Sequence, residues 1–255
     1  MVRRGLAASP DEARDTIVAG HVTVGGWPVH KPESLVAEDD AIVVSSPTRR
    51  FVSRGGEKLA AALDRFGLDP SGRRCLDAGA STGGFTDVLL HRGAARVVAV
   101  DVGYGQLAWR LRTDRRVTVM ERTNVRDLRP DDLPYAPDLI VVDLSFISLV
   151  KVIPALAGLA APAADLVALV KPQFEATPEE VSPGGVVADP DVRRRVIEAV
   201  AESCRAAGLG PIDVSVSPLR GPAGNAEIFL WARKGEAGRE LDLEAAMHPE
   251  TRRHA

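Results

Sequence analysis

The stretch RRCLDAGASTGGFTDVLLHRGAARVVAVD, from Arg73 to Asp101, predicts a strand, a glycine turn, a helix and a second strand that ends on an acid. Its first strand is the apolar run from Cys75 to Ala78. The glycines of the turn have no Cβ, so they allow a sharp bend and a close approach of the backbone to a ligand. We expect Ser81 or Thr82 to cap the helix, whose free amide groups favour electronegative ligand atoms. Asp101, at the tip of the second strand, is placed to bind the two hydroxyls of a ribose.

Three kinds of nucleotide-binding loop compete for this turn, and the spacing separates them. A dinucleotide loop needs G-x-G-x-x-G, but the glycines that follow Gly79 are Gly83 and Gly84, so the middle glycine is missing. A phosphate-binding P-loop needs a lysine where this chain has Phe85. The looser pattern that remains, acid-x-Gly-x-x-x-Gly with a second acid after the next strand, suits S-adenosylmethionine, a nucleoside without phosphates. An ordinary strand-to-helix turn without a ligand is the alternative.

Composition limits the class of protein. The chain has 255 residues, of which 45% are hydrophobic, so it is long enough for one full domain and a small appendage. We find no apolar run of bilayer length and no apolar core in the opening MVRRGLAASPDEAR, and we therefore expect a cytoplasmic protein without a membrane partner. The two cysteines, Cys75 and Cys204, are expected to be buried thiols, and the five histidines have no ligand spacing, so no metal is expected. The net charge of −3 argues against a generally basic nucleic-acid binder but permits a local basic patch.

A polar, basic segment, SSPTRRFVSR at residues 45–54, predicts a boundary between two parts of the chain. Upstream of it, Asp11 to Ala19 has helical spacing after Ser9 and Pro10, which suit a cap and a first helical turn. The stretch HVTVGGWPV then alternates apolar and polar residues around Gly25 and Gly26, which is typical of a hairpin with a two-residue turn. The expected unit is therefore helical first and ends in a small sheet.

This order of elements, with the string GHVTVGGWPVHKPESLV from Gly20 to Val36, resembles the S4 RNA-binding domain of ribosomal protein S4, pseudouridine synthases and related RNA modifiers. S4 domains usually begin with another apolar helical turn before the position of Val2, so we expect this chain to start inside that helix, either because the start codon was placed too late or because the domain is trimmed. The resemblance implies that basic side chains contact the RNA backbone, with solvated surface charge as the alternative for each one. The candidates, including those of the linker, are Arg3, Arg4, Arg14, Lys31, Arg49, Arg50 and Arg54.

Downstream of the linker, strands and helices alternate, as expected for an α/β fold with a parallel sheet. The expected strands are Cys75 to Ala78, Arg96 to Asp101, Val117 to Arg122, Leu139 to Asp143 and Leu166 to Val170. The expected helices are Glu57 to Phe66, Thr86 to Arg92, Gln106 to Arg112, Ser148 to Ala160 and Asp191 to Ala207. Two further strands, Ile212 to Ser217 and Ala226 to Trp231, are separated by a turn too short for a parallel crossover and should form an antiparallel hairpin. A mostly parallel sheet that ends in such a hairpin resembles the Rossmann-like fold of S-adenosylmethionine-dependent methyltransferases.

Four charged residues interrupt apolar elements. Asp143 and Lys171 come directly after apolar strands, where ligands of open parallel sheets bind. Lys58 lies on the helix before the first strand of the sheet, and Glu227 at the start of the last strand. Buried charges are costly unless they pair, so two structural ion pairs are the alternative to a catalytic group.

The spacing of these four residues resembles the Lys-Asp-Lys-Glu tetrad of the FtsJ-like 2′-O-methyltransferases, which act on ribose hydroxyls of RNA. With the S4-like part in front, residues 1 to 235 resemble the TlyA family of ribosomal RNA cytidine-2′-O-methyltransferases, historically labelled haemolysins. The matching strings are SRGGEKL, LDAGASTGGFTD, VDVGYGQL, DLSFISL, LVKPQFE, SPGGVV and SPLRGPAGNAEIFLW. The implied domains are an S4-like domain at 1–45, a linker at 46–54, a methyltransferase domain at 55–235, and a polar tail or short helix at 236–255.

The resemblance implies a catalytic tetrad of Lys58, Asp143, Lys171 and Glu227. Lys171, held by Asp143 and Glu227, would draw off or polarise the proton of the ribose hydroxyl, and Lys58 would orient that hydroxyl or offset negative charge. Which tetrad member is the general base stays open. The candidate contacts of the cofactor S-adenosylmethionine are Asp77, Gly79, Ser81, Thr82, Gly83, Gly84, Phe85, Asp101 and Asn124, although Asn124 and Asp127 suit a plain turn equally well.

Other features accompany this interpretation. The loop from Glu175 to Asp189 is a candidate gate for RNA, and Tyr104 and Trp109 are expected to pack rather than to stack on a base. The implied partner is the RNA of one or both ribosomal subunits, and a monomer is favoured. Two other classes compete with this one: a catalytically inactive RNA-binding protein of ribosome assembly, and a membrane-damaging haemolysin, for which the sequence has neither a spanning segment nor a strongly basic amphipathic helix.

Overall fold

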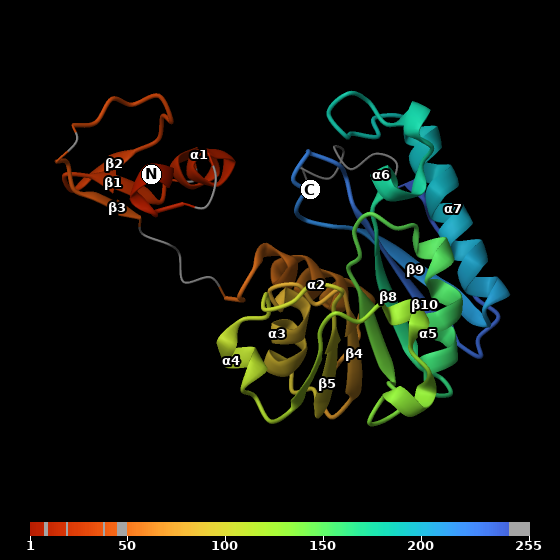
Figure 1. Cartoon of the computed structure of the whole chain (residues 1–255). Helices are drawn as coiled ribbons and strands as arrows, with labels where there is room; N and C mark the ends of the chain where they lie inside the picture. Colours follow the sequence, from red (N-terminus) through yellow and green to blue (C-terminus); the bar gives the residue numbers. More distant parts are fainter. Residues whose placement is uncertain (8–9, 19, 38, 45–49, 245–255) are drawn as a thin grey trace. The chain divides into compact units, whose positions relative to one another are not determined.

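The computed structural model describes residues 1–7, 10–18, 20–37, 39–44 and 50–244. The chain divides into two compact units, Met1–Arg50 and Phe51–Ala255 (Figure 1).

The first unit contains a small antiparallel sheet. Its described elements are the 3-10 turn η1 (Val2–Arg4), the helix α1 (Pro10–Val18) and the strands β1 (Val22–Val24), β2 (Trp27–Val29) and β3 (Ile42–Val44), in the order β2-β1-β3. Gly25 and Gly26 both have positive φ, as a two-residue hairpin turn between right-twisted strands requires. Pro28 lies on the edge strand, where its missing N–H breaks no ladder. The predicted hairpin is confirmed, while the predicted cap Ser9 and helix end Ala19 lie outside the described residues.

The second unit is built on one mixed sheet. Within its described part, seven strands follow the order β6-β5-β4-β7-β8-β10-β9. The bounds are Arg74–Ala78 (β4), Arg96–Val100 (β5), Val117–Met120 (β6), Leu139–Val142 (β7), Asp165–Val170 (β8), Leu209–Val216 (β9) and Ile228–Lys234 (β10). Strands β4 to β8 run parallel, whereas β10 is antiparallel to both β8 and β9. The predicted parallel sheet and its terminal hairpin are therefore confirmed.

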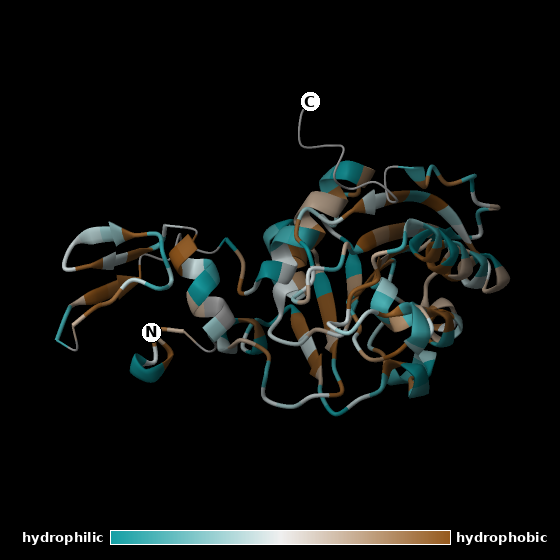
Figure 2. Ribbon diagram, turned by 90° about the horizontal axis from the view of Figure 1, so that it is seen from above, coloured by the Kyte–Doolittle hydropathy of each residue, from teal (hydrophilic) through white to brown (hydrophobic). Residues whose placement is uncertain are grey.

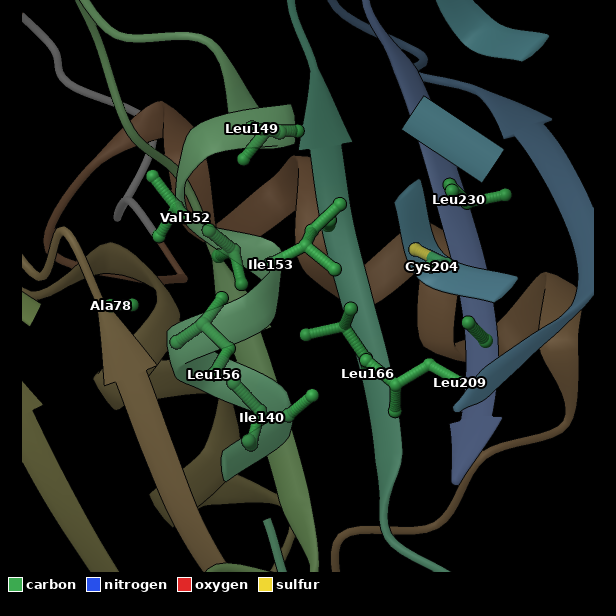
Figure 3. Packing of buried hydrophobic residues seen from close by; sticks show 14 of the residues in the cluster. Ala78, Ile140, Leu149, Val152, Ile153, Leu156, Leu166, Cys204, Leu209 and Leu230 are labelled. Carbon is green, nitrogen blue, oxygen red and sulfur yellow. The ribbon is translucent and has the colours of Figure 1, made fainter. Parts of the chain in front are cut away.

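Helices cover both faces of this sheet (Figure 1). The bounds are Arg54–Phe66 (α2), Gly84–His91 (α3), Trp109–Arg112 (α4), Ile153–Leu159 (α5), Pro172–Glu175 (α6) and Pro190–Ala206 (α7), with 3-10 turns at Val125–Asp127 (η2), Pro130–Asp132 (η3), Leu149–Lys151 (η4) and Pro178–Glu180 (η5). Successive strand residues point to opposite faces, so Cys75 packs with α2 and α3, and Leu76 packs with α5 and α7. The strands are accordingly hydrophobic along most of their length (Figure 2), as expected for strands buried on both faces. Figure 3 shows Ile153 and Leu156 of α5 packed toward Ile140 and Leu166 of the sheet.

Several element boundaries differ from the prediction. The helix expected from Glu57 begins earlier, at Arg54, and the one expected from Gln106 begins only at Trp109. The segment expected to be one helix from Ser148 to Ala160 is a 3-10 turn followed by α5, which has a proline in its first turn. The described residues after 235 lie in part beside β9, since Arg239 N–H donates to the Pro211 carbonyl, and Leu243 is buried in the core.

Candidate active site

Asp77 fixes the turn between β4 and α3. Its Oδ2 accepts hydrogen bonds from the backbone N–H of Thr86 at 2.8 Å and from the Thr86 hydroxyl at 2.7 Å, so it satisfies a free donor at the start of α3. The helix begins after Gly83, and the expected capping by Ser81 or Thr82 is wrong, because the acid of the neighbouring strand takes that role. Complete burial raises the pKa of Asp77 to about 7, although the hydrogen bonds from Thr86 work in the opposite direction.

The glycines of this turn are required by close packing of the protein itself. Gly79 and Gly83 both have positive φ. A Cβ at Gly79 would overlap the backbone oxygen of Asp143, and one at Gly83 would overlap the side chain of Leu111. A Cβ at Gly84 would lie equally close to atoms at the N-terminus of α2. The turn is thereby held against β7, α4 and α2 at once, which gives it one conformation.

A hollow lies beside Asp101, at the carboxyl ends of β5 and β6. The Asp101 carboxylate accepts hydrogen bonds from the backbone N–H groups of Ser81 and Gly103, both at 2.7 Å. The lining includes these three residues, Gln106 and Glu121. Carboxylates and an amide around a small hollow are typical of a site that binds the hydroxyls and ring nitrogens of a nucleoside.

Glu121 of this lining was missed by the sequence analysis. It follows β6 directly, as Asp101 follows β5 and Asp143 follows β7, so the same pattern of an acid after an apolar strand could have found it. Its Oε1 accepts from the backbone N–H of Gly105 and pairs with Arg112, and the hydrogen bond from Arg112 is the main cause that lowers its pKa.

Three other candidates for the cofactor have different surroundings. The Phe85 side chain is buried in the core, where its ring centroid lies 6.1 Å from that of Phe229. The Thr82 carbonyl accepts from Ala108 N–H and holds the following loop. The Asn124 side chain accepts from Arg126 N–H and caps η2, which is the turn-forming role that the sequence left open.

The first pair of the predicted tetrad joins α2 to the start of β10. Lys58 Nζ lies 2.5 Å from Glu227 Oε2, and both side chains are nearly buried, with exposed fractions of 11% and 2%. Removing two charges from water is costly, and the short contact offsets that cost only while both partners remain.

The second pair joins the ends of β7 and β8. Lys171 Nζ lies 2.6 Å from Asp143 Oδ1, and it also donates a hydrogen bond of 2.9 Å to Ser145 Oγ. Ser145 was not among the predicted site residues, because nothing in its spacing distinguishes it from other loop serines. The Lys171 ammonium is thus held by two groups of the loop that follows β7. The prediction that Glu227 also holds Lys171 is wrong, because Glu227 pairs with Lys58.

The sheet register brings the two pairs to one edge. Ile228 of β10 lies opposite Val170 of β8, so the next positions along these antiparallel strands are Glu227 and Lys171. The turn at Gly79 touches the backbone of Asp143, which places the glycine turn at the same strand ends. This is the edge at which open parallel sheets bind ligands.

The expected basic residues are distributed over both units. The exposed ones are Arg3, Arg4, Arg14, Lys31, Arg50 and Arg54, and Arg49 lies outside the described residues. Arg4 donates to the backbone oxygens of Asp40 and Ala37 and so also holds its own unit together.

Tyr104 and Trp109 are exposed, so the expectation that they pack is wrong. The Arg122 guanidinium lies over the Tyr104 ring, 4.2 Å from its centroid.

Metal-binding clusters and membrane-spanning helices are absent from the described residues. No group of three or more histidines, cysteines or acids in the described part of the chain is arranged to hold a metal ion. Of the helices in the described ranges, none is long and apolar enough to cross a membrane.

Comparison with known proteins defines the class. The model of the FtsJ-like methyltransferase family matches residues 51–234, and the fold and strand-end site described above agree with a Rossmann-like methyltransferase. The chain is 54% identical to the 16S/23S rRNA (cytidine-2′-O)-methyltransferase TlyA of Mycobacterium tuberculosis over 97% of its own length and 94% of that protein. It is 38% identical to Hemolysin A of Brachyspira hyodysenteriae, and the match covers 88% of this chain and 94% of that protein. A solved structure from Streptococcus thermophilus that carries a hemolysin name has a TM-score of 0.79 at 36% identity and covers 98% of this chain and 94% of its own.

The protein is therefore an S-adenosylmethionine-dependent methyltransferase. Within that class, the chain belongs to the FtsJ-like family and to its TlyA branch.

The residues present fit the cofactor of this class. Asp77 Oδ1 is buried and has no hydrogen-bond partner among the described residues, so it can accept a hydrogen bond from a bound ligand. The hollow beside Asp101 offers carboxylate acceptors for ribose hydroxyls. Both features offer acceptor oxygens rather than a cation for a phosphate group, which agrees with a nucleoside ligand that carries no phosphate.

Proposed function

We propose that this enzyme transfers a methyl group from S-adenosylmethionine to the 2′-hydroxyl of a cytidine ribose in ribosomal RNA of the small subunit, the large subunit or both. The observation that carries the proposal is the pairing of each of two lysines with a carboxylate at the sheet edge that holds the glycine turn. The named activity of the Mycobacterium tuberculosis relative, at 54% identity, supports the choice of nucleotide.

The proposed chemistry assigns a role to each pair. Bound S-adenosylmethionine supplies an electrophilic methyl group, and alignment with the ribose oxygen provides most of the acceleration. Lys171, fixed by Asp143 and Ser145, takes the proton of the 2′-hydroxyl when it is a neutral amine, or polarises that hydroxyl when it is an ammonium, while the oxygen bonds to the methyl group that leaves the sulfonium sulfur. Lys58, fixed by Glu227, orients the hydroxyl and offsets the negative charge that develops on its oxygen.

The cofactor roles are part of the same proposal. The glycine turn would hold the methionine end of S-adenosylmethionine. Its residues are Asp77, Gly79, Ser81, Thr82, Gly83, Gly84 and Phe85. Phe85 would act through its backbone, since its side chain is in the core. Asp101 and Glu121 would bind the nucleoside part through the hollow that they line.

The first unit supports a role in RNA binding. We propose that residues 1–45 are an S4-like domain, that 46–54 is a basic linker, and that 55–235 is the catalytic domain. Exposed Arg3, Arg14, Lys31, Arg50 and Arg54 are suited to phosphate contacts. The proposed substrate places the enzyme in the cytoplasm with assembling ribosomal subunits, and we propose that it acts as a monomer.

The test is methyl transfer from methyl-labelled S-adenosylmethionine to separated, unmodified 30S and 50S subunits, followed by nucleoside analysis of the RNA. We expect label in 2′-O-methylcytidine, and the labelled subunit identifies the substrate. Label on a base, or on the ribose of another nucleoside, would contradict the proposed specificity. RNA binding without transfer would instead indicate a catalytically inactive RNA-binding protein.

A further inference from the structure

Two loops carry the second ion pair of the site, and they are joined at a point outside the tetrad. The loop after β7 runs from Asp143 to Leu149, and the segment after β8 runs from Lys171 through α6 to Glu175. Lys171 connects their near ends through Asp143 and Ser145.

Glu175 connects their far ends. Its Oε2 accepts a hydrogen bond of 2.6 Å from the Ser148 hydroxyl, and its Oε1 accepts one of 2.7 Å from the backbone N–H of Leu149. The carboxyl group is half-buried, and burial raises its pKa, while the two hydrogen bonds lower it. A carboxylate with both oxygens engaged in this way restrains two backbone segments in one relative position.

Between these two connections the loop has a strained residue, Phe146, followed by Ile147, which is partly buried against the core. Phe146 has a φ of +63°, which is costly for a non-glycine residue, and the residue is 91% exposed. Its only aromatic contact among the described residues is with Phe174, at a centroid distance of 5.1 Å. A loop in this conformation persists only where its ends are fixed.

We propose that Glu175 is a positioning residue that holds the loop from Asp143 to Leu149, and with it the Lys171 ammonium, in the geometry needed for methyl transfer. The inference rests on the proposed function, because it assumes that Lys171 acts on the reacting hydroxyl. Both hydrogen bonds of the Glu175 carboxylate come from Ser148 and Leu149, and Glu175 acts through these two residues.

The alternative is that Glu175 only caps the chain at η4. Such a cap would contribute stability and leave the rate of transfer unchanged at temperatures well below unfolding. The two roles therefore differ in kcat, in cofactor affinity and in the effect of a conservative variant.

The experiment compares the full chain carrying Glu175→Ala, Glu175→Gln or Asp132→Ala with the wild type. Asp132→Ala is the matched control, because Asp132 also caps a short 3-10 turn, η3, through the N–H of Arg129. Measured for each are kcat and KM of methyl transfer to unmodified ribosomal subunits, the Kd of S-adenosylmethionine, and the melting temperature.

We expect Glu175→Ala to lower kcat by about 10- to 100-fold, because displacement of a reacting group by about an ångström has an effect of this size. The Kd and the KM of S-adenosylmethionine should stay within about twofold of the wild-type values. Glu175→Gln keeps an acceptor for Leu149 N–H and a donor toward Ser148, so it should recover most of kcat. Asp132→Ala should leave kcat unchanged.

The inference is overturned if Glu175→Ala keeps kcat within twofold of the wild type. It is also overturned if the alanine and glutamine variants lose kcat only in parallel with cofactor binding or with the melting temperature. A wild type that transfers no methyl group would overturn the proposed function and this inference together, whereas an active wild type with an unaffected Glu175→Ala variant overturns this inference alone.

Discussion

Lys58 and Glu227 are oppositely charged residues that are both buried, and their mutual contact is what makes their burial tolerable. Glu227→Ala should therefore lower the free energy of unfolding by about 3–5 kcal/mol, since it leaves a buried ammonium without its partner. Urea denaturation of the variant and the wild type measures the difference.

A double variant separates the charge from the packing. Lys58→Met with Glu227→Leu removes both charges, and we expect it to be more stable than Glu227→Ala alone. If the single variant is as stable as the wild type, the pair does not stabilise the fold in the way described.

Asp77 predicts a dependence of stability on pH. Its pKa is raised from 3.8 to about 7 in the folded protein, mainly by burial, so the folded state holds the proton more tightly than the unfolded chain. Between these two values the folded state binds more protons, and the free energy of unfolding must fall as the pH rises. Asp77→Asn cannot ionise at this position and does not show that decrease.

The stability of Asp77→Asn relative to the wild type should accordingly increase from about pH 5 to about pH 8. Urea denaturation at the two pH values measures the change without ligand. A difference between the two proteins that is the same at both pH values would show that the Asp77 carboxyl group does not titrate in this window.

The glycine turn shows at the scale of elements why one backbone position is restricted to glycine. Gly79 has positive φ, and its missing Cβ makes room for the Asp143 backbone oxygen. Gly67, at the C-terminal cap of α2, also has positive φ but has no atom within 4 Å of the position of a Cβ. Gly67→Ala should cost about 1–2 kcal/mol of stability through backbone strain alone and leave cofactor binding intact.

Gly79→Ala should lose more stability than this control and bind S-adenosylmethionine at least about 10-fold more weakly, because the turn must move away from β7. Isothermal titration with the cofactor, together with thermal unfolding of both variants, gives the comparison. Equal cofactor affinity in the two alanine variants would contradict the role given to this turn.

The strands were the elements that the sequence predicted best, and the reason is physical. Strands buried on both faces, such as β7 and β8, are nearly continuous apolar runs, and their short length and the charged residues and prolines beside them define their ends. The start of α3 was predicted with the wrong cap, because the acceptor, Asp77, lies in the strand before the turn, nine residues before Thr86, rather than at the usual capping position next to the helix. Contacts such as Lys171 with Ser145 join two loops, and no spacing within one segment indicates them.

At the scale of the whole molecule, the chain combines a catalytic unit with a small unit that carries exposed basic residues. If Arg14 and Lys31 bind RNA phosphates, replacing both with glutamine should weaken the binding of ribosomal subunits. The slope of log affinity against log salt should become shallower by about 0.7 to 0.9 for each phosphate that the variant no longer binds. Filter binding across a salt series measures both quantities.

Cofactor affinity should not change in that variant. Arg96→Gln is a suitable control, because Arg96 is exposed at the first residue of β5, the edge opposite the strand carboxyl ends. If the slope of log affinity against log salt is identical in the double variant, the control and the wild type, Arg14 and Lys31 do not bind RNA phosphates.

The central claim is that Lys171, held by Asp143, acts on the ribose hydroxyl. Single-turnover methyl transfer to unmodified subunits by the wild type and by Lys171→Ala, with the Kd of S-adenosylmethionine measured for both, tests it most directly. The account predicts that the variant binds the cofactor within about twofold of the wild type but loses at least about 100-fold in the rate of 2′-O-methylcytidine formation. A variant that binds the cofactor normally and methylates at the wild-type rate would contradict it.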